Sequence, residues 1–134
     1  MNNTAINPGS IHEPLGIYSH TIKVDPGATW LAIAGQLGVD AGGRTAEGFS
    51  AQAELALENV LACLGAGGMT SEDLVKLTIF STVPDCMSDI RAARRKVMGE
   101  GVLPAVTLLI VAGLATPEYL VEVEGWAAKT VNEV

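Results

Sequence analysis

The sequence predicts one α+β domain in which helices cover one face of a β-sheet. Its 134 residues suit a single domain that is large enough to bury its own core. One long segment has the apolar period of a helix, and several shorter segments have the length and composition of strands. No composition break, low-complexity tract or internal repeat divides the chain, so we expect a single domain over residues 1–134.

The chain begins with β-structure rather than with a helix. Residues 1–14 are polar, and we expect them to form an extended lead-in. Two strands follow, at His20–Val24 and Thr29–Gly35, joined by a turn at Asp25-Pro26-Gly27. Asp40–Gly43 is a second turn signal, which separates these strands from the first helix.

The clearest helix is predicted over Ala46–Leu64, where apolar residues recur at spacings of three and four. The stripe consists of Phe49, Ala53, Ala56, Leu57, Val60 and Leu64. Three glycines at 65, 67 and 68 end the helix, because glycine adopts the left-handed cap without steric cost. A phosphate-binding loop is the alternative, but this stretch follows a helix and has no lysine before Thr70. Thr70–Asp73 resembles a capping box for a short helical turn.

The second half of the chain alternates strands with one more helix. Val75–Thr82 is predicted as a strand, and Cys86–Met98 as a helix with Ile90, Ala93 and Val97 on one face. The last two predicted strands are Ala105–Val111 and Tyr119–Ala127. The predicted order is therefore ββ-α-β-α-ββ.

The strand Ala105–Val111 predicts self-association, because it is apolar on both faces. One face carries Val106, Leu108 and Ile110, and the other carries Leu109 and Val111. The strand Val75–Thr82 is nearly the same, with Phe80 opposite Leu77 and Ile79. Two helices can cover only one side of such a sheet, so we expect another copy of the chain to cover the other side in a closed homo-oligomer.

The charge of the chain argues against nucleic acid as a partner. The net charge is −7 and the pI about 4.6, whereas a phosphate backbone needs a positive field. The one basic cluster, Arg91, Arg94, Arg95 and Lys96, lies in a predicted helix. We interpret it as a solvated helix face rather than an anion site.

Cysteine and histidine usage predicts a cytoplasmic protein without a metal. Cys63 and Cys86 stand in unrelated contexts, which is typical of reduced thiols. No export signal is visible, and no apolar run is long enough to cross a membrane. His12 and His20 are the only histidines and form no ligand motif, so no metal is expected.

Two glutamates in the last predicted strand are the best candidates for chemistry. Glu122 and Glu124 share one face, because side chains two residues apart in a strand point the same way. A carboxylate in a protected site could transfer protons. An alternating edge strand with a hydrated charged face is the competing interpretation.

Taken in order, several motifs resemble those of the YjgF/RidA (Rid) family. The matching segments are Gly16-Ile17-Tyr18-Ser19-His20, Ala34-Gly35-Gln36, Gln52–Leu64 with the glycines after it, Asp73–Phe80, Pro104-Ala105-Val106-Thr107 and Leu120–Ala127. They stand where the family has G-P-Y-S-Q, S-G-Q, a long helix, D-V-V-K-x-T-V-F, P-A-R-[ST] and V-E-I-E-A-I-A. The series covers nearly the whole chain without large gaps.

The resemblance implies a chorismate-mutase-like fold and a homotrimer with sites in the clefts between subunits. It also implies hydrolysis of small enamines and imines to 2-oxo acids and ammonia, without a cofactor. By analogy with the family, Glu122 would position the attacking water, and Tyr18 and the backbone of Gly35 would complete the pocket. Gln36, Thr107 and Leu108 fall at neighbouring site positions.

The chain departs from the family at the residue that clamps the substrate carboxylate. The arginine of P-A-R-[ST] is replaced by Val106, which cannot form a bidentate pair with a carboxylate. Losing such a contact costs about ten- to a hundredfold in binding. Arg91 or His20 could supply the missing charge.

Two functions remain open from the sequence. One is a divergent Rid-type hydrolase that uses Glu122, and the other is a non-catalytic trimer that binds a small apolar or weakly acidic metabolite. Ribonuclease labels also attach to this family, but the acidic charge and scarcity of aromatic residues disfavour that activity here. The sequence does not identify the substrate.

Overall fold

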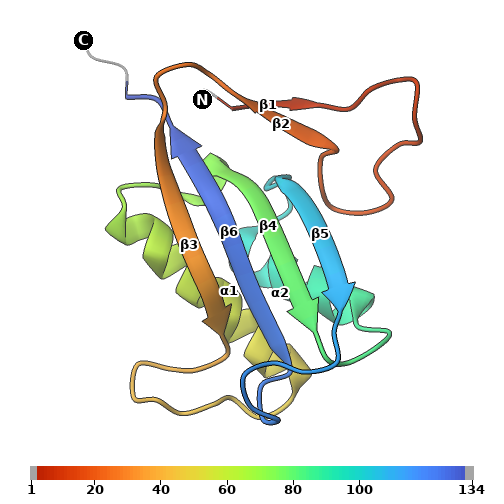
Figure 1. Ribbon diagram of the computed structural model, residues 1–134, viewed down its shortest axis with the longest axis vertical. Coiled ribbons are helices and arrows are strands. Elements are labelled where there is room, and N and C mark those ends of the chain that lie inside the picture. Colours follow the sequence, from red (N-terminus) through yellow and green to blue (C-terminus); the bar gives the residue numbers. More distant parts are fainter. Residues whose placement is uncertain (1–2, 132–134) are drawn as a thin grey trace.

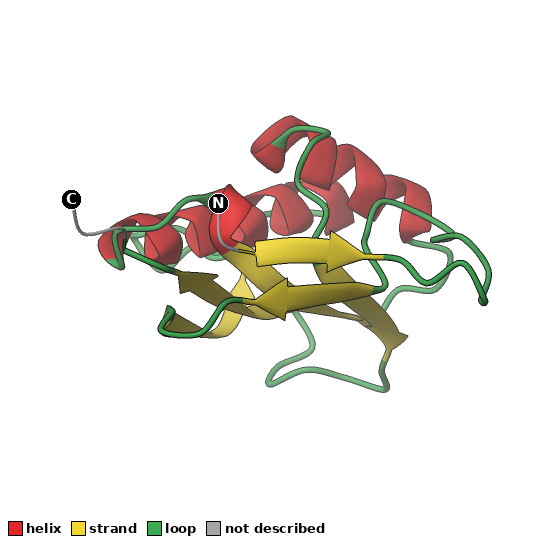
Figure 2. Ribbon diagram, turned by 90° about the horizontal axis from the view of Figure 1, so that it is seen from above, coloured by secondary structure: helices red, strands yellow, loops and turns green. Residues whose placement is uncertain are grey.

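The computed structural model describes residues 3–131 and has two layers, with two α-helices packed on one face of a four-stranded sheet (Figures 1 and 2). The strand order is β3-β6-β4-β5. Strands β4 and β5 are parallel, and the other neighbours are antiparallel. The predicted α+β class, with helices on one face of a mixed sheet, is confirmed.

Every predicted strand and helix is present, although several ends are shifted. In chain order the elements are β1 (Asn3–Ile6), β2 (Thr21–Val24), β3 (Thr29–Leu37), α1 (Phe49–Ala66), a 3-10 turn (Ser71–Asp73), β4 (Leu74–Ser81), α2 (Met87–Met98), β5 (Ala105–Ile110) and β6 (Val121–Lys129). The largest shift is at the start of α1, predicted at Ala46 and found at Phe49. Gly48 has a φ of 89°, which keeps the preceding residues out of the helix.

Strand β1 lies in the predicted lead-in and was not predicted as a strand. It pairs antiparallel with β2 in a separate two-stranded sheet at one end of the main sheet (Figure 1). The side-chain amide of Asn3 donates to the carbonyls of Ala128 (3.0 Å) and Asp73 (3.3 Å), which ties this hairpin to the main sheet. Its four residues, two polar followed by two apolar, carry no alternating pattern, so only the pairing with β2 reveals the strand.

The apolar stripe of α1 packs into the core as predicted. Its buried residues are Gln52, Ala53, Ala56, Leu57, Val60 and Leu64. Gln52 is the polar member, and its side-chain amide donates to the carbonyls of Ala46 and Glu118, both at 3.0 Å. Its Oε1 accepts from the backbone N–H of Leu120 at 2.9 Å. This one side chain therefore fixes the loop before α1 and the chain just before β6.

Both predicted helix-end signals are confirmed. Gly68 takes the left-handed conformation (φ 73°), and Met69 N–H donates to the carbonyl of Leu64 at 2.9 Å. The glycine-rich stretch is thus a helix cap. Beyond it, the carboxylate of Asp73 accepts from the backbone N–H of Thr70 at 2.9 Å, which forms the expected capping box.

The register of the sheet decides which side chains face the helices. Leu77 and Ile79 in β4 are buried in the core with residues from both helices. Val106 and Leu108 in β5 pair with them and therefore share the helix-covered face. Glu122 pairs with Phe80 and lies on the opposite face, which no described element covers within residues 3–131.

The open face of the sheet carries large exposed apolar side chains. The exposed fraction is 52% for Trp30, 48% for Trp126 and 44% for Leu109. The two indole rings meet edge to face, with centroids 6.2 Å apart. The prediction that helices cover only one side of the sheet is confirmed.

No helix within residues 3–131 has both the length and the apolar character needed to cross a bilayer.

Candidate functional site

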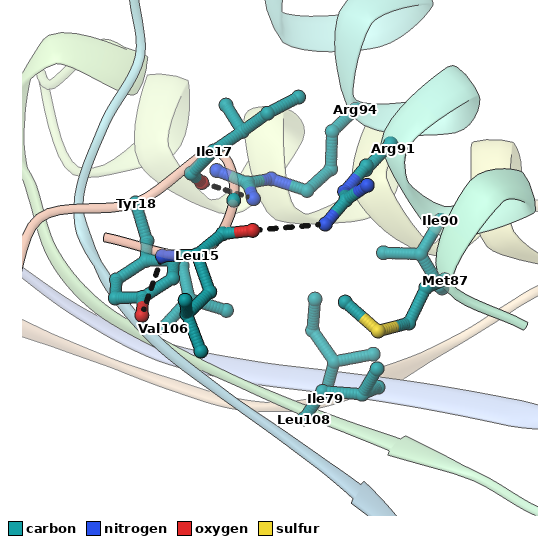
Figure 3. A pocket seen from close by; sticks show the side chains of 11 residues that line it. Leu15, Ile17, Tyr18, Ile79, Met87, Ile90, Arg91, Arg94, Val106 and Leu108 are labelled. Atoms are coloured by element: carbon teal, nitrogen blue, oxygen red, sulfur yellow. Dashed lines mark hydrogen bonds between the residues drawn. The ribbon is translucent and has the colours of Figure 1, made fainter. Parts of the chain in front are cut away.

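A pocket of about 240 Å³ lies between helix α2, the helix-covered edge of the sheet and the segment before β2 (Figure 3). The segment contributes Leu15–Tyr18, and α2 contributes Met87, Ile90, Arg91 and Arg94. Ile79, Val106 and Leu108 form its floor on β4 and β5. Most of this lining is aliphatic, and the charged groups among these residues are the two arginines.

Hydrogen bonds to backbone carbonyls hold the segment in place. Arg91 Nη2 donates to the carbonyl of Leu15 at 3.3 Å, and Arg94 Nη1 donates to that of Ile17 at 2.5 Å (Figure 3). The hydroxyl of Tyr18 accepts from the backbone N–H of Leu15 at 3.1 Å. Ser19 anchors the end of the segment, since its hydroxyl donates to the carbonyl of Leu103 at 2.7 Å. Side-chain hydrogen bonds thus hold the irregular backbone of this segment, which forms one wall of the pocket.

The prediction of a solvated basic helix face is wrong for Arg94. Its side chain is 5% exposed, and Nη2 also donates to the carbonyl of Val102 at 3.4 Å. Burial lowers the pKa of the Arg94 guanidinium because the charged form loses its hydration. The prediction holds for Arg95 and Lys96, which are exposed and pair with Glu100 and Glu54.

Arg94 was missed because its partners are carbonyls, which the sequence pattern does not display. The available signal was its position, four residues after Ile90 and one after Ala93, on the apolar face of the predicted helix. Arg91 lies at the edge of the same face and is half-buried. A basic residue in line with a buried stripe could have been identified as a pocket residue.

The P-A-V-T segment sends its side chains in two directions. Val106 and Leu108 line the pocket. Thr107 points to the open face, where its hydroxyl accepts a hydrogen bond from Lys76 Nζ at 2.6 Å. The three residues therefore do not form one site within a single chain.

Glu122 is the more protected of the two strand glutamates. Its carboxylate lies over Gly35, where the register of β3 and β6 shifts between Ile33 and Gln36. A Cβ built on Gly35 would clash with Oε2 of Glu122 and stand 2.7 Å from its carboxyl carbon. Glu122 is half-buried and Glu124 is exposed. Strand β6 is internal to the sheet, so the edge position in the competing interpretation is wrong, while the exposure of Glu124 agrees with its hydrated face.

The candidate residues therefore form two groups on opposite faces of the sheet. Gly35 and Glu122 lie on the open face, with Gln36 beside them in β3, where its amide donates to the carbonyl of Ala34 at 3.0 Å. Tyr18, Arg91, Val106 and Leu108 line the pocket on the helix side. One chain alone does not bring the two groups together.

Of the two side chains considered as a replacement for the lost arginine, Arg91 lines the pocket and His20 does not. The Nε2 atom of His20 lies 2.7 Å from the carbonyl oxygen of His12, and its ring contacts that of Tyr18 edge to face. His20 therefore packs against the segment outside the pocket, and its ring also contacts the ring of His12 edge to face.

Within the described part of the chain, no three or more histidine, cysteine or acidic side chains are placed so that they could hold a metal ion. Cys63 and Cys86 are free thiols.

Comparison with known proteins places this architecture in a family. Residues 10–129 match the family model described as endoribonuclease L-PSP. The RutC family protein YjgH of Escherichia coli K12 is 27% identical over 124 residues, which cover 92% of this chain and 94% of that protein. A RutC family protein of Buchnera aphidicola is 31% identical over 81 residues, which cover 60% of this chain and 61% of that protein.

Solved structures agree with the sequence relatives. The Rid family protein YyfB of Yersinia pestis, of unknown function, superposes with a TM-score of 0.85 at 30% identity, over 96% of this chain and all of that one. RidA from an Antarctic Psychrobacter has a TM-score of 0.68 at 30% identity, over 92% of this chain and 98% of that one. The family-model match, the ordered motifs and this shared fold together show that the chain belongs to the endoribonuclease L-PSP family, that of the YjgF/RidA proteins.

Proposed function

We propose that this chain is a divergent Rid-type hydrolase that converts a small enamine or imine into a carbonyl compound and ammonia. The observation that carries the proposal is the carboxylate of Glu122 seated over Gly35 on a central strand, because both residues match the family's site. RidA of Psychrobacter shares the fold of this chain, and family membership makes this chemistry the first to test.

In this proposal the working unit is a homotrimer. The two groups of site residues lie on opposite faces of the sheet, so a complete site needs the Glu122 group of one subunit against the pocket group of another. The exposed side chains of Trp30, Trp126 and Leu109 support such an assembly, because large apolar side chains gathered on one exposed face often mark a surface that a partner covers.

The reaction follows from one carboxylate and one water. An enamine first tautomerises to the imine, and Glu122 then accepts a proton from water as the water oxygen bonds to the C=N carbon. Glu122 returns this proton to the nitrogen, which gives the carbinolamine. The hydroxyl proton of the carbinolamine then moves to the nitrogen as the C–N bond breaks, so that C=O forms and ammonia leaves. The net change is addition of water and release of ammonia, so no oxidant or reductant is needed.

The test is ammonia release from freshly generated 2-aminoacrylate and 2-iminobutyrate. We expect the wild-type protein to accelerate release and Glu122→Gln to abolish the acceleration, a fall of at least about 100-fold. Glu124→Gln is the matched control, because this glutamate shares the strand and face of Glu122 but is exposed. Equal rates in the wild type and Glu122→Gln would overturn the hydrolase proposal.

A second candidate is a trimer that binds a small metabolite without turning it over. The aliphatic lining of the pocket and the presence of Val106 at the family's arginine position favour it. Ligands that raise the melting temperature of the trimer without being consumed would support this function. An inactive wild type that gains ammonia release as Val106→Arg would point the same way, since the scaffold would then be competent but tuned to another ligand.

The name of the family model raises ribonuclease activity as a further alternative. The net charge of −7 disfavours it, because the phosphate backbone of RNA would meet a repulsive average field.

A further inference from the structure

We infer that the pocket binds the carboxylate of a ligand through Arg91 of helix α2 and holds the rest of the ligand as an apolar side chain. A helix arginine would thus supply the charge that Val106 in strand β5 cannot. This inference rests on the proposed function for its site and goes beyond it by naming the ligand class: 2-imino and 2-oxo acids with branched aliphatic tails.

The first observation is that Arg91 has unused hydrogen-bonding capacity. Within residues 3–131 its hydrogen bond runs from Nη2 to the carbonyl of Leu15 and is 3.3 Å long, beyond the usual range for N–H···O. A guanidinium has five N–H donors. Among the described residues no carboxylate lies within ion-pair distance of Arg91, whereas Arg95 and Lys96 on the same helix each have one.

The second observation is a buried positive charge beside it. Arg94 lies one turn along α2, is 5% exposed and also has no carboxylate partner within residues 3–131. Its Nε is buried without a hydrogen-bond partner in the same range. Two guanidinium groups without a counter-charge make this pocket positive in a chain whose net charge is −7. An anionic group at the pocket would stabilise both of them.

The third observation concerns the rest of the lining. Apart from the arginines and the tyrosine, the side chains are aliphatic or thioether: Leu15, Ile17, Ile79, Met87, Ile90, Val106 and Leu108. In Figure 3, Met87 lies below Arg91 across the pocket, and Ile79 and Leu108 lie lower still. An apolar tail is favourable there, and the polyanionic surface of a phosphate is not. A carboxylate with an aliphatic tail fits both halves of the lining.

Calorimetric titration with 4-methyl-2-oxopentanoate tests the inference, because this 2-oxo acid is not turned over. We expect the wild type to bind it about 10- to 100-fold more tightly than the uncharged 4-methyl-2-oxopentanamide, and more tightly than pyruvate or inorganic phosphate. Arg91→Gln should remove the preference for acid over amide without changing the affinity for the amide. Arg95→Gln is the matched control and should behave as the wild type, because Arg95 is exposed and outside the pocket.

Two further variants distinguish the loss of the Arg91 charge from a general loss of folded structure. Arg91→Lys keeps the charge but not the fork of donors, so we expect an intermediate affinity. The double variant Arg91→Gln/Val106→Arg should recover the preference for the acid, because both positions line the same pocket. Thermal unfolding should confirm that each variant is folded.

The inference is overturned if the wild type does not bind the acid, if it binds the amide equally well, or if Arg91→Gln leaves the affinity for the acid unchanged. These outcomes are separable from those of the hydrolase test. Acid binding that depends on Arg91 without any ammonia release would support the inference while the hydrolase proposal fails. Ammonia release that depends on Glu122 but is unchanged by Arg91→Gln would support the hydrolase proposal while the inference about Arg91 fails.

Discussion

The two groups of site residues are built in different ways. Glu122 stands on the central strand of the sheet, and its carboxylate rests on the backbone of Gly35. The pocket that includes Arg91 lies at the edge strand β5, and its wall is an irregular segment held by long side chains. The first group depends on strand register, and the second on side-chain identity.

This difference explains where the chain departs from its family. Register cannot change at one position without moving a whole strand, because a slip of one residue turns every side chain to the other face. A single lining position of a pocket can change from arginine to valine with the loss of one contact and no change in strand register. The residues proposed for chemistry thus match the family, while Val106 departs from it at the arginine position proposed for recognition.

We expect the largest effect from a substitution that prevents the two groups of site residues from coming together at a subunit interface. Leu109→Asp places a carboxylate on the open face, where we propose that a neighbouring subunit packs. Burying an unpaired charge costs several kcal/mol, so we expect the trimer to dissociate or the chain to unfold. Light scattering after size exclusion measures the mass.

Ala92→Asp is the control for this substitution, because Ala92 is exposed on the helix layer. It should leave the mass unchanged. A folded trimer with the same mass in Leu109→Asp would rule out the open face as the interface and leave the fold assignment intact.

The fold was largely predictable because its core elements carry strong local patterns. The stripe of α1, the cap at Gly68 and the apolar strands β4 and β5 each follow from spacing or composition. Strand β1 was not predictable, since its only signal is its pairing with β2. The start of β6 shifted to Val121 because Leu120 gives its N–H to the side chain of Gln52 instead of the sheet.

The site was predictable only in part. Sequence spacing places Glu122 and Glu124 on one face, but whether Val106 lies on the same face depends on how β5 and β6 each pair with β4. The burial of Arg94 depends in part on the carbonyl of Ile17, which lies 77 residues away in the chain. Such long-range contacts leave no periodic trace in the sequence, so the division into two groups emerged only from the structure.

A smaller perturbation acts on the Glu122 group alone. Gly35→Ala introduces a Cβ that would clash with the carboxylate of Glu122, and this glycine has no positive φ that would forbid alanine. The carboxylate must move, and a displacement of about 1 Å can cost up to about 100-fold in rate. We expect kcat for ammonia release to fall about 10- to 100-fold, with a KM close to that of the wild type. A wild-type kcat would show that the contact with Gly35 does not position the carboxylate.

The smallest perturbation is the same substitution in the other group. Gly16→Ala places a Cβ 3.0 Å from Nη2 of Arg91, and Gly16 likewise has no positive φ. The contact is with the distal end of a flexible side chain, which can move away with little loss of free energy. We expect the dissociation constant for 4-methyl-2-oxopentanoate to rise only about two- to fivefold, with kcat unchanged. The two glycine-to-alanine substitutions therefore test the two groups separately. A fall in kcat from Gly16→Ala would contradict the assignment of chemistry to the sheet and recognition to the pocket. A change in affinity alone from Gly35→Ala would contradict it as well.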